Sequence, residues 1–415
     1  MDHVLVRVLD LDRVRFPPGP ADHGSPFVRY RGLLHSQHRA RAAGVPDDEY
    51  VALAARLDEA VSRVAGRGFL STPFGRSTVL SDRLGFSAAG GVWVKDETGN
   101  VAGSHKARHL MGVLLHLEVS ERAGLTDPAR RPDLAIASCG NAALAAAVLA
   151  RAADRRLRVF VPRHADHHVL ESLRELGADV VTCTHTDGTP GDPTYARLRA
   201  AIAAGAVPFT CQGPENGLVI EGGETMAYEI ATSLREEGVG LDHLVVQVGG
   251  GALASACLQG LAEAADLGVL ERVPCTHTVQ TTGGHPLERA YRLVRALLPA
   301  TPTGEEAEAA LREAAQHRSA YMWPWETEPR SIATGILDDE TYDWRATVAG
   351  MLATGGRPLV VSEQLLAQAH DLGHAAGHAV CPTGSAGLAG LLTLVADGTV
   401  GPDDRVAVLF TGVDR

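Results

Sequence analysis

From about residue 71 onward, short apolar runs alternate with amphipathic stretches, and this alternation dominates the chain. The apolar runs are rich in Val, Leu and Ile and too short for helices, which predicts buried strands. The stretches between them repeat apolar residues at helical spacing, as Leu110, Val113, Leu114 and Leu117 do. Strands are predicted at residues 92–94, 134–137, 159–161, 180–182, 207–210, 244–248, 276–279, 358–361 and 406–410.

The order of these elements predicts the fold class. Helices are expected between strands, at residues 142–152, 167–176 and 195–204. A β-α-β-α order gives parallel sheets covered by helices, so we predict an α/β protein with two open, twisted, mainly parallel sheets that meet at a cleft. The predicted parts are a helical extension at 1–70, a large domain of 71–108 and 216–415, and a smaller α/β domain at 109–215.

One stretch breaks the alternation. Residues 297–330 contain Pro299-Ala300-Thr301-Pro302 and Trp323-Pro324-Trp325, and we expect an irregular surface excursion or lid there. Its two tryptophans could roof a pocket or anchor the excursion, and we favour anchoring. The acidic run that starts at Glu305 is expected to open a solvated helix.

Composition excludes several classes of protein. The chain has 415 residues and a formal net charge of −12, which argues against nucleic acid as a partner. No apolar run reaches membrane-spanning length, so we expect no membrane partner. Met1-Asp2-His3-Val4 lacks the basic segment and apolar core of a secretory signal, and the six cysteines form no Cys-x-x-Cys pair. Both features predict a cytoplasmic protein.

Lysine is rare, and this narrows the candidate chemistry. The chain has 38 Lys and Arg, of which only Lys95 and Lys106 are lysines. Lys106 opens a predicted helix, where the helix dipole disfavours a charged amine and favours a neutral, nucleophilic one. The alternative is a solvated surface lysine. Lys95 ends a predicted strand beside Asp96 and Glu97, which hold it protonated, so we expect it to be structural.

Two loops between a strand and a helix could bind anions. Gly249-Gly250-Gly251-Ala252-Leu253 follows a buried strand, and its glycines let backbone N–H groups approach a phosphate at a helix start. A tight structural turn is the alternative for this loop.

Ser138-Cys139-Gly140-Asn141 is placed in the same way and offers N–H groups to a carboxylate. Here the alternative is plain helix capping by Asn141.

These loops, in this order, resemble those of the fold-type II pyridoxal-phosphate enzymes, the superfamily of the tryptophan synthase β-subunit, threonine synthase and the threonine and serine dehydratases. The resemblance covers about residues 70–415. Residues 95–97 and 103–106 resemble Lys-x-Glu…Gly-Ser-Phe/His-Lys, and residues 138–141 resemble the Ser-Ser-Gly-Asn loop. Residues 331–335 are similar to a dehydratase motif, and residues 221–225 with Glu229 and Ile230 are closer to threonine synthase.

The resemblance implies roles for particular residues. It makes pyridoxal 5′-phosphate the cofactor, held in the interdomain cleft, with Lys106 as the Schiff-base lysine and His105 beside it. The loop at 249–253 is then the phosphate site in the cofactor-binding large domain. Asn141 would touch the cofactor's 3′-oxygen, and residues 138–141 would hold the substrate carboxylate. Thr411 would place a hydroxyl at the pyridine nitrogen.

The implied reaction is β-elimination or β-replacement on a small L-amino acid, Ser, Thr or an O-activated derivative, through an aminoacrylate. A hydroxyl such as that of Thr411 cannot hold the pyridine nitrogen protonated, and the weaker electron sink suits these reactions. One alternative is a threonine synthase-like β,γ-replacement on phosphohomoserine. Another is a catalytically silent cofactor-binding subunit. We expect a homodimer.

Two residues depart from the family pattern. Cys139 stands where racemases carry a catalytic Ser, which puts racemisation in doubt, and Cys381 stands where dehydratases usually show an acid before Pro. His370, His374 and His378 recur at i, i+4, i+8, which favours a polar face of one helix over a metal site. We therefore expect no metal.

Overall fold

The computed structural model describes residues 8–19, 24–163, 165–184 and 192–414, which fall into two compact units. The large unit comprises residues 72–99 and 226–414, and the small unit comprises 8–71 and 100–225. The predicted domain boundary after residue 108 falls inside a helix, Lys106–Arg122. Because that helix is one rigid body, Lys106 groups with the small unit. The N-terminal helices also belong to the small unit.

The large unit is built on a six-stranded sheet of order β1-β2-β10-β7-β8-β9. All neighbouring pairs are parallel except β1 with β2. Its strands are β1 (Phe74–Ser77), β2 (Gly91–Asp96), β7 (His243–Gln247), β8 (Cys275–Thr281), β9 (Pro358–Val361) and β10 (Arg405–Phe410). Its helices are α4 (Thr78–Arg83), α10 (Ala252–Asp266), α11 (Pro286–Arg295), α12 (Gly304–Gln316), α13 (Trp344–Thr354), α14 (Glu363–Ala375) and α15 (Pro382–Ala396), with short 3-10 turns at Arg318–Ala320 and Thr334–Ile336.

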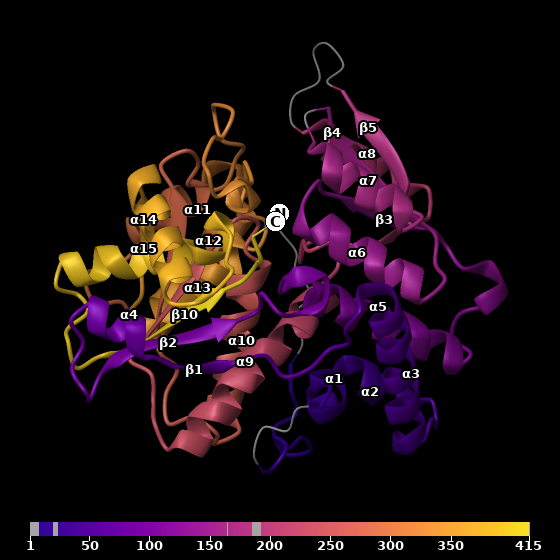
Figure 1. The fold of residues 1–415 in the computed structure, drawn as a ribbon, viewed down its shortest axis with the longest axis horizontal. Coiled ribbons are helices and arrows are strands. Elements are labelled where there is room, and N and C mark those ends of the chain that lie inside the picture. Colours follow the sequence, from indigo (N-terminus) through magenta and orange to yellow (C-terminus); the bar gives the residue numbers. More distant parts are fainter. Residues whose placement is uncertain (1–7, 20–23, 164, 185–191, 415) are drawn as a thin grey trace. The chain divides into compact units, whose positions relative to one another are not determined.

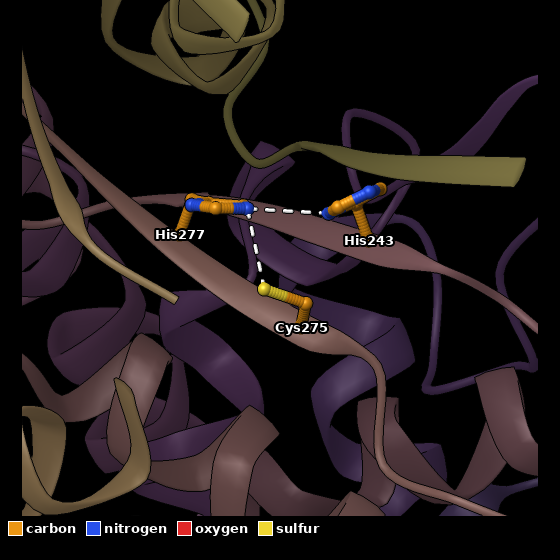
Figure 2. Close-up of side chains that lie close together, drawn as sticks. All are labelled: His243, Cys275 and His277. Atoms are coloured by element: carbon orange, nitrogen blue, oxygen red, sulfur yellow. Dashed lines mark hydrogen bonds between the residues drawn. The ribbon is translucent and has the colours of Figure 1, made fainter. Parts of the chain in front are cut away.

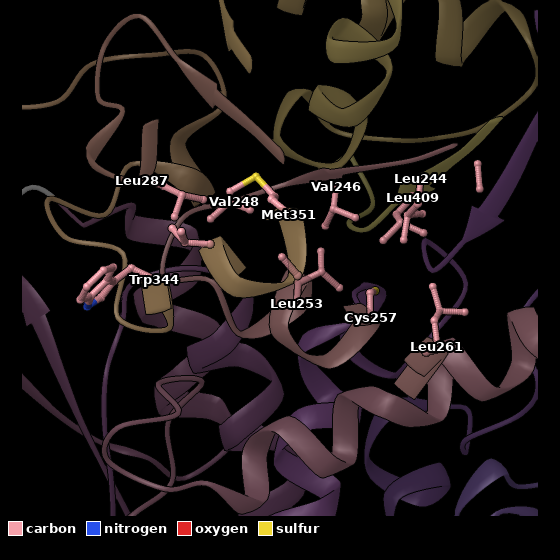
Figure 3. Close-up of a cluster of buried hydrophobic side chains, with 14 of the residues drawn as sticks. Leu244, Val246, Val248, Leu253, Cys257, Leu261, Leu287, Trp344, Met351 and Leu409 are labelled. Atoms are coloured by element: carbon pink, nitrogen blue, oxygen red, sulfur yellow. The ribbon is translucent and has the colours of Figure 1, made fainter. Parts of the chain in front are cut away.

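Both faces of this sheet are buried, as the unbroken apolar runs of its strands require. Along β10, Ala407 and Leu409 enter one apolar cluster, and Val406, Val408 and Phe410 enter another. The first cluster lies against α10 and α13 (Figure 3). The second lies against α14 and α15. Helices on both faces leave the strand ends as the places where polar chemistry can reach the sheet.

The small unit holds a parallel four-stranded sheet of order β5-β4-β3-β6 (Figure 1). Its strands are β3 (Leu134–Ala137), β4 (Leu157–Pro162), β5 (Asp179–Cys183) and β6 (Val207–Pro208). Its helices are α1 (Pro26–Arg29), α2 (His35–Ala42), α3 (Asp47–Ala65), α5 (Lys106–Arg122), α6 (Asn141–Ala152), α7 (His167–Glu175) and α8 (Pro193–Ala203), with 3-10 turns at Arg31–Leu33, Val101–Gly103 and Pro128–Arg130. Helix α9 (Leu218–Glu237) begins in the small unit and ends in the large one.

The expectation of an irregular excursion over residues 297–330 is wrong in its central part. The 13-residue helix α12 begins there with a capping box between Thr303 and Glu306. Its apolar side, Ala310, Leu311 and Ala314, is buried in the core of the large unit. The acidic run at Glu305 does open a helix, as predicted, but one side of that helix is buried and not solvated.

The two tryptophans do anchor the segment that follows α12. The Arg289 guanidinium lies over the Trp323 ring at 3.7 Å from its centroid and 5.1 Å from that of Trp325. The backbone N–H of Trp325 also donates to Asp339 O at 2.9 Å. Among the described residues, no helix combines the length and apolarity needed to span a membrane.

Candidate active site

Lys106 is the first residue of α5, as the sequence predicts, and it is half-buried. The residue at the N-cap position is His105, which is 7% exposed and makes no side-chain cap. Ser104, just before it, is fully buried, and its hydroxyl has no hydrogen-bond partner among the described residues. A buried hydroxyl without a partner is costly, which indicates a polar group that completes the site when bound.

Close packing fixes the helix that carries Lys106. Gly112 of α5 and Gly222 of α9 meet so closely that a β-carbon at Gly222 would collide with Arg108 O and lie 2.7 Å from His109 O. The ring nitrogen Nδ1 of His109 also lies 2.8 Å from Val219 O. This glycine contact gives Gly222, part of the motif at 221–225, a packing role within the small unit.

The loop at 138–141 joins β3 to α6. Its residues are all half-buried, and the Gly140 N–H donates to Ser138 Oγ at 3.4 Å. Gly140 occupies the N-cap position, and Asn141 is already the first helical residue. The alternative that Asn141 serves only as the helix N-cap is therefore wrong. Cys139 lies at the tip of the same half-buried turn.

In the large unit, the glycine loop joins β7 to α10. Gly251 is the N-cap of α10 with φ +98°, a left-handed conformation that requires glycine, and no side chain caps the helix. The first N–H groups of α10, from Ala252 and Leu253 onward, thus have no cap from their own N-cap residue. An uncapped helix start behind a strand is a ready anion site.

The segment after the 3-10 turn Thr334–Ile336 packs tightly against this loop, which the sequence did not predict. A β-carbon at Gly249 would collide with Asp338 Oδ2, and one at Gly250 would lie 2.9 Å from the Tyr342 ring. The Asp343 N–H donates to Gly250 O at 2.8 Å. The glycines therefore serve close packing as well as any anion. The same packing brings the Asp338 carboxylate beside the loop.

Thr411 follows β10 and is 2% exposed. The amide nitrogen Nε2 of Gln247, the last residue of β7, lies 2.7 Å from its Oγ1 and 2.8 Å from Gly384 O. A carbonyl oxygen only accepts, which fixes Nε2 on this side of Gln247. Thr411 is therefore the acceptor in its bond with Gln247, and its own hydrogen is directed to a different acceptor. Nothing in the sequence pattern singled out Gln247.

Lys95 is fully buried in the large unit. Its Nζ lies 2.5 Å from Glu229 Oε2 and donates to Thr72 O at 2.8 Å. A buried ion pair of this kind keeps the amine charged, which agrees with the prediction of a structural lysine.

The three histidines predicted on one helix face are not together. Helix α14 ends at Ala375, and His378 beyond it lies 2.7 Å from Asp96 Oδ2. His370 and His374 face Asp414 at 3.3 and 3.5 Å. The expected single face is therefore wrong, because the helix ends before its third histidine.

The predicted site residues divide between the two units. Lys106, His105 and the loop at 138–141 belong to the small unit, and the glycine loop and Thr411 belong to the large unit. Within the large unit, β7 and β10 are parallel neighbours, so the glycine loop and Thr411 share one edge of the sheet. Ligands of α/β proteins bind at that edge, at the carboxyl ends of the strands.

Known proteins resemble this chain over most of its length. A family model described as Pyridoxal-phosphate dependent enzyme matches residues 67–412. A threonine synthase of Methanosarcina acetivorans is 26% identical over 346 residues, which is 82% of this chain and 74% of that protein. An L-serine dehydratase of Saccharomyces cerevisiae is 27% identical over 205 residues, 48% of this chain and 58% of that protein.

A solved structure, a threonine deaminase from T.th., superimposes with a TM-score of 0.62 at 22% identity, covering 87% of this chain and 98% of that one. At this identity the likeness concerns the fold, and it confirms the predicted α/β class with mainly parallel sheets.

Proposed function

The chain belongs to the family of pyridoxal-phosphate dependent enzymes, and on that premise we propose that it catalyses β-elimination or β-replacement on a small L-amino acid. Family membership confirms the predicted cofactor, pyridoxal 5′-phosphate, and the predicted enzyme class. The reaction and the residues that perform it are our proposal.

The residues present fit this cofactor. The hydroxyl of Ser104 is buried next to the Lys106 turn without a partner among the described residues. The start of α10 is uncapped behind a left-handed Gly251, as a phosphate site requires. The Asp338 carboxylate beside the same loop disfavours a phosphate there, but the two features above both favour the cofactor. We therefore propose that Lys106 binds the cofactor covalently and that the backbone at 249–253 binds its phosphate.

The choice of reaction rests on the hydrogen bonding of the Thr411 hydroxyl. Its hydroxyl accepts from Gln247, so it can donate its own hydrogen to an unprotonated ring nitrogen. When bound, the cofactor withdraws electrons from the substrate Cα, and a neutral partner at its ring nitrogen keeps that withdrawal moderate. Moderate withdrawal favours prompt loss of a β-substituent over transamination.

Other residues bind the substrate and move its proton. Lys106 is the first residue of α5, and we propose that its amine takes the proton from the substrate Cα. The turn formed by Ser138, Cys139, Gly140 and Asn141 offers hydrogen-bond donors at the start of α6 to the substrate carboxylate.

The lysine assignment can be tested directly. Borohydride reduction of the protein followed by peptide mapping should place the pyridoxyl group on Lys106, and Lys106→Ala should lose both the label and the activity. Lys95 serves as the internal control, because its amine is held by Glu229. A label on Lys95 would overturn the proposed mechanism.

A threonine synthase-like β,γ-replacement is the second candidate. The threonine synthase aligns with 82% of this chain, whereas the L-serine dehydratase aligns with 48%. A product assay separates the two. Ser or Thr should yield ammonia and a 2-oxo acid in the first case, and phosphohomoserine should release phosphate without a 2-oxo acid in the second. If Ser, Thr, their O-acetyl and O-phospho derivatives and phosphohomoserine all fail to react in a protein that retains its cofactor, both candidates fail.

Assembly and compartment stay predictions. A homodimer is expected, and sedimentation velocity checks it. A cytoplasmic location is expected as well, and fractionation of the source cells checks that.

A further inference from the structure

Two histidines and a cysteine meet on one face of the large sheet (Figure 2), near the amino ends of β7 and β8. His243 opens β7 and Cys275 opens β8, and the two are directly opposite in the parallel register. His277 follows two residues later, so its side chain points to the same face as that of Cys275. The sequence alone does not reveal this cluster, because His243 and Cys275 are about 30 residues apart and only strand pairing brings them together.

Two of the three donor–donor distances lie close to those of a tetrahedral metal site, and all three donors lie within 4.8 Å of one another. Nε2 of His277 lies 3.2 Å from His243 Nδ1 and 3.4 Å from Cys275 Sγ. Zinc bonds of about 2.0 Å to nitrogen and 2.3 Å to sulfur place tetrahedral ligands about 3.3–3.6 Å apart. Together with the chemistry of the three donors, the geometry points to a site for one Zn²⁺ ion, bound by His243, Cys275 and His277, with a fourth position open to water.

The surroundings support one histidine as a ligand and oppose the other. Nε2 of His243 lies 3.9 Å from Asp404 Oδ2, too far for a hydrogen bond, but the nearby negative charge favours a cation bound to this imidazole. His277 differs, because the Arg357 backbone N–H donates to its Nδ1 at 3.3 Å. Nε2 then carries the ring proton until a metal displaces it, and this long hydrogen bond must open. We therefore expect an affinity about 10–100-fold below that of a site whose two histidines both donate outward.

The donor atoms of this partly buried site determine which metal ions it can bind. His277 is 2% exposed, and His243 and Cys275 are half-buried. Imidazole and thiolate suit Zn²⁺ and exclude hard ions such as Mg²⁺ and Ca²⁺. The site lies at the amino ends of the strands, so it is separate from the edge that carries the glycine loop and Thr411.

The test uses the tag-free, cofactor-loaded protein after treatment with a chelator. Titration with Co²⁺ should give visible bands of tetrahedral intensity at one equivalent, and Zn²⁺ should abolish them. Cys275→Ser should weaken binding at least about 100-fold, because it removes one of the three metal-binding donors. If Cys275→Ser fails to fold, His243→Gln, at a half-buried position, replaces it.

His374→Gln is the matched control, because His370, His374 and Asp414 form the other group of metal-type side chains among the described residues. It should leave the Co²⁺ spectrum unchanged. Loss of binding in His374→Gln but not in Cys275→Ser would overturn the proposal, as would weak octahedral spectra or the absence of binding at one equivalent. Binding is read independently of activity, so these outcomes do not depend on the proposed reaction.

Discussion

Gln247 determines which way the hydroxyl of Thr411 can donate. Its Nε2 lies 2.7 Å from Thr411 Oγ1, 2.8 Å from Gly384 O and 3.2 Å from Leu409 O, and all of these groups are buried. Replacing Gln247 with Leu leaves a buried carbonyl without this donor, which costs about 1–3 kcal/mol. It also lets the Thr411 hydroxyl rotate, so the absorbance of the bound cofactor should shift and kcat should fall more than KM rises.

The control for Gln247→Leu is Gln37→Leu on α2 of the small unit. Gln37 is also buried and donates to Asp47 at 3.1 Å. A comparable loss of stability without a spectral shift is expected there. If Gln247→Leu changes only stability, Gln247 does not position Thr411.

Thr411 itself can be varied in two directions. Thr411→Val should weaken cofactor binding by about one hydrogen bond, on the order of 1 kcal/mol. Thr411→Asp places a carboxylate next to the Gln247 donor, and it should disturb the cofactor spectrum, cut elimination and raise side transamination. Unchanged spectra and rates in both variants would assign the ring nitrogen to another residue.

For Asp338 we expect a substitution to strengthen cofactor binding, whereas Thr411→Val should weaken it. Its carboxylate lies beside Gly249, where a phosphate is proposed to bind, and like charges repel. Asp338→Asn keeps the shape and removes the charge, so the cofactor should be retained more tightly, with a slower loss on dialysis. Weaker retention would mean that Asp338 supports the loop rather than opposing its ligand.

At the scale of elements, the crossing of α5 and α9 offers the sharpest test. Gly222→Ala adds a methyl group where Arg108 O leaves no room, and we expect a loss of about 1–3 kcal/mol in stability. Since α5 begins with Lys106, the variant should also slow reattachment of the cofactor. Gly32→Ala is the control, because nothing lies within 4 Å of a β-carbon there. Urea midpoints and cofactor reconstitution rates measure both effects.

Strands and helices were predictable where a single local pattern, such as an unbroken apolar run, determines them. Residues 134–137 and 358–361 were predicted as the structure has them in β3 and β9, because these strands are apolar throughout. The edge strand β1, Phe-Gly-Arg-Ser, was missed, since it is half-buried and has no apolar run. The start of helix α12 was predicted from the acidic run at Glu305, but its burial against the core was not. For β1 and for the buried side of α12, tertiary packing decided the outcome.

For the molecule as a whole, the sequence predicted which residues begin helices and which follow strands. These local predictions place Lys106, Asn141 and Gly251 at helix starts, where the structure has them. It could not predict Gln247, Asp338 or the cluster of His243, Cys275 and His277. These depend on which strands are neighbours and on which segment packs over a loop. Such pairings join residues far apart in the chain, and local spacing carries no record of them.

Acid should destabilise the folded chain through His116. Burial, together with the neighbouring His35 and Arg39, lowers the pKa of His116 to about 4. The unfolded chain then takes up a proton below about pH 6.5 that the folded chain refuses until about pH 4. Stability is therefore complete above pH 6.5 and falls between pH 6.5 and 4, by about 2 kcal/mol once solvent screening is allowed for.

His116→Gln should flatten this part of the pH profile, as urea unfolding at pH 4.5 and 7 would measure. His168→Gln, at an exposed position, is the control and should keep the full slope. An unchanged slope in His116→Gln would place the acid sensitivity elsewhere.

The position of β10 in its sheet has a consequence for how the chain is made. Residues 405–410 are synthesised after every other strand of this sheet, yet they form the strand between β2 and β7. A nascent chain can complete the β3–β6 sheet while synthesis continues, whereas the large sheet stays incomplete until its central strand has been made. Until that strand arrives, the backbone edges of β2 and β7 are exposed to any other extended chain. Strand β10 thus completes this sheet and brings in Thr411 in a single event, which ties completion of the sheet to completion of the proposed site.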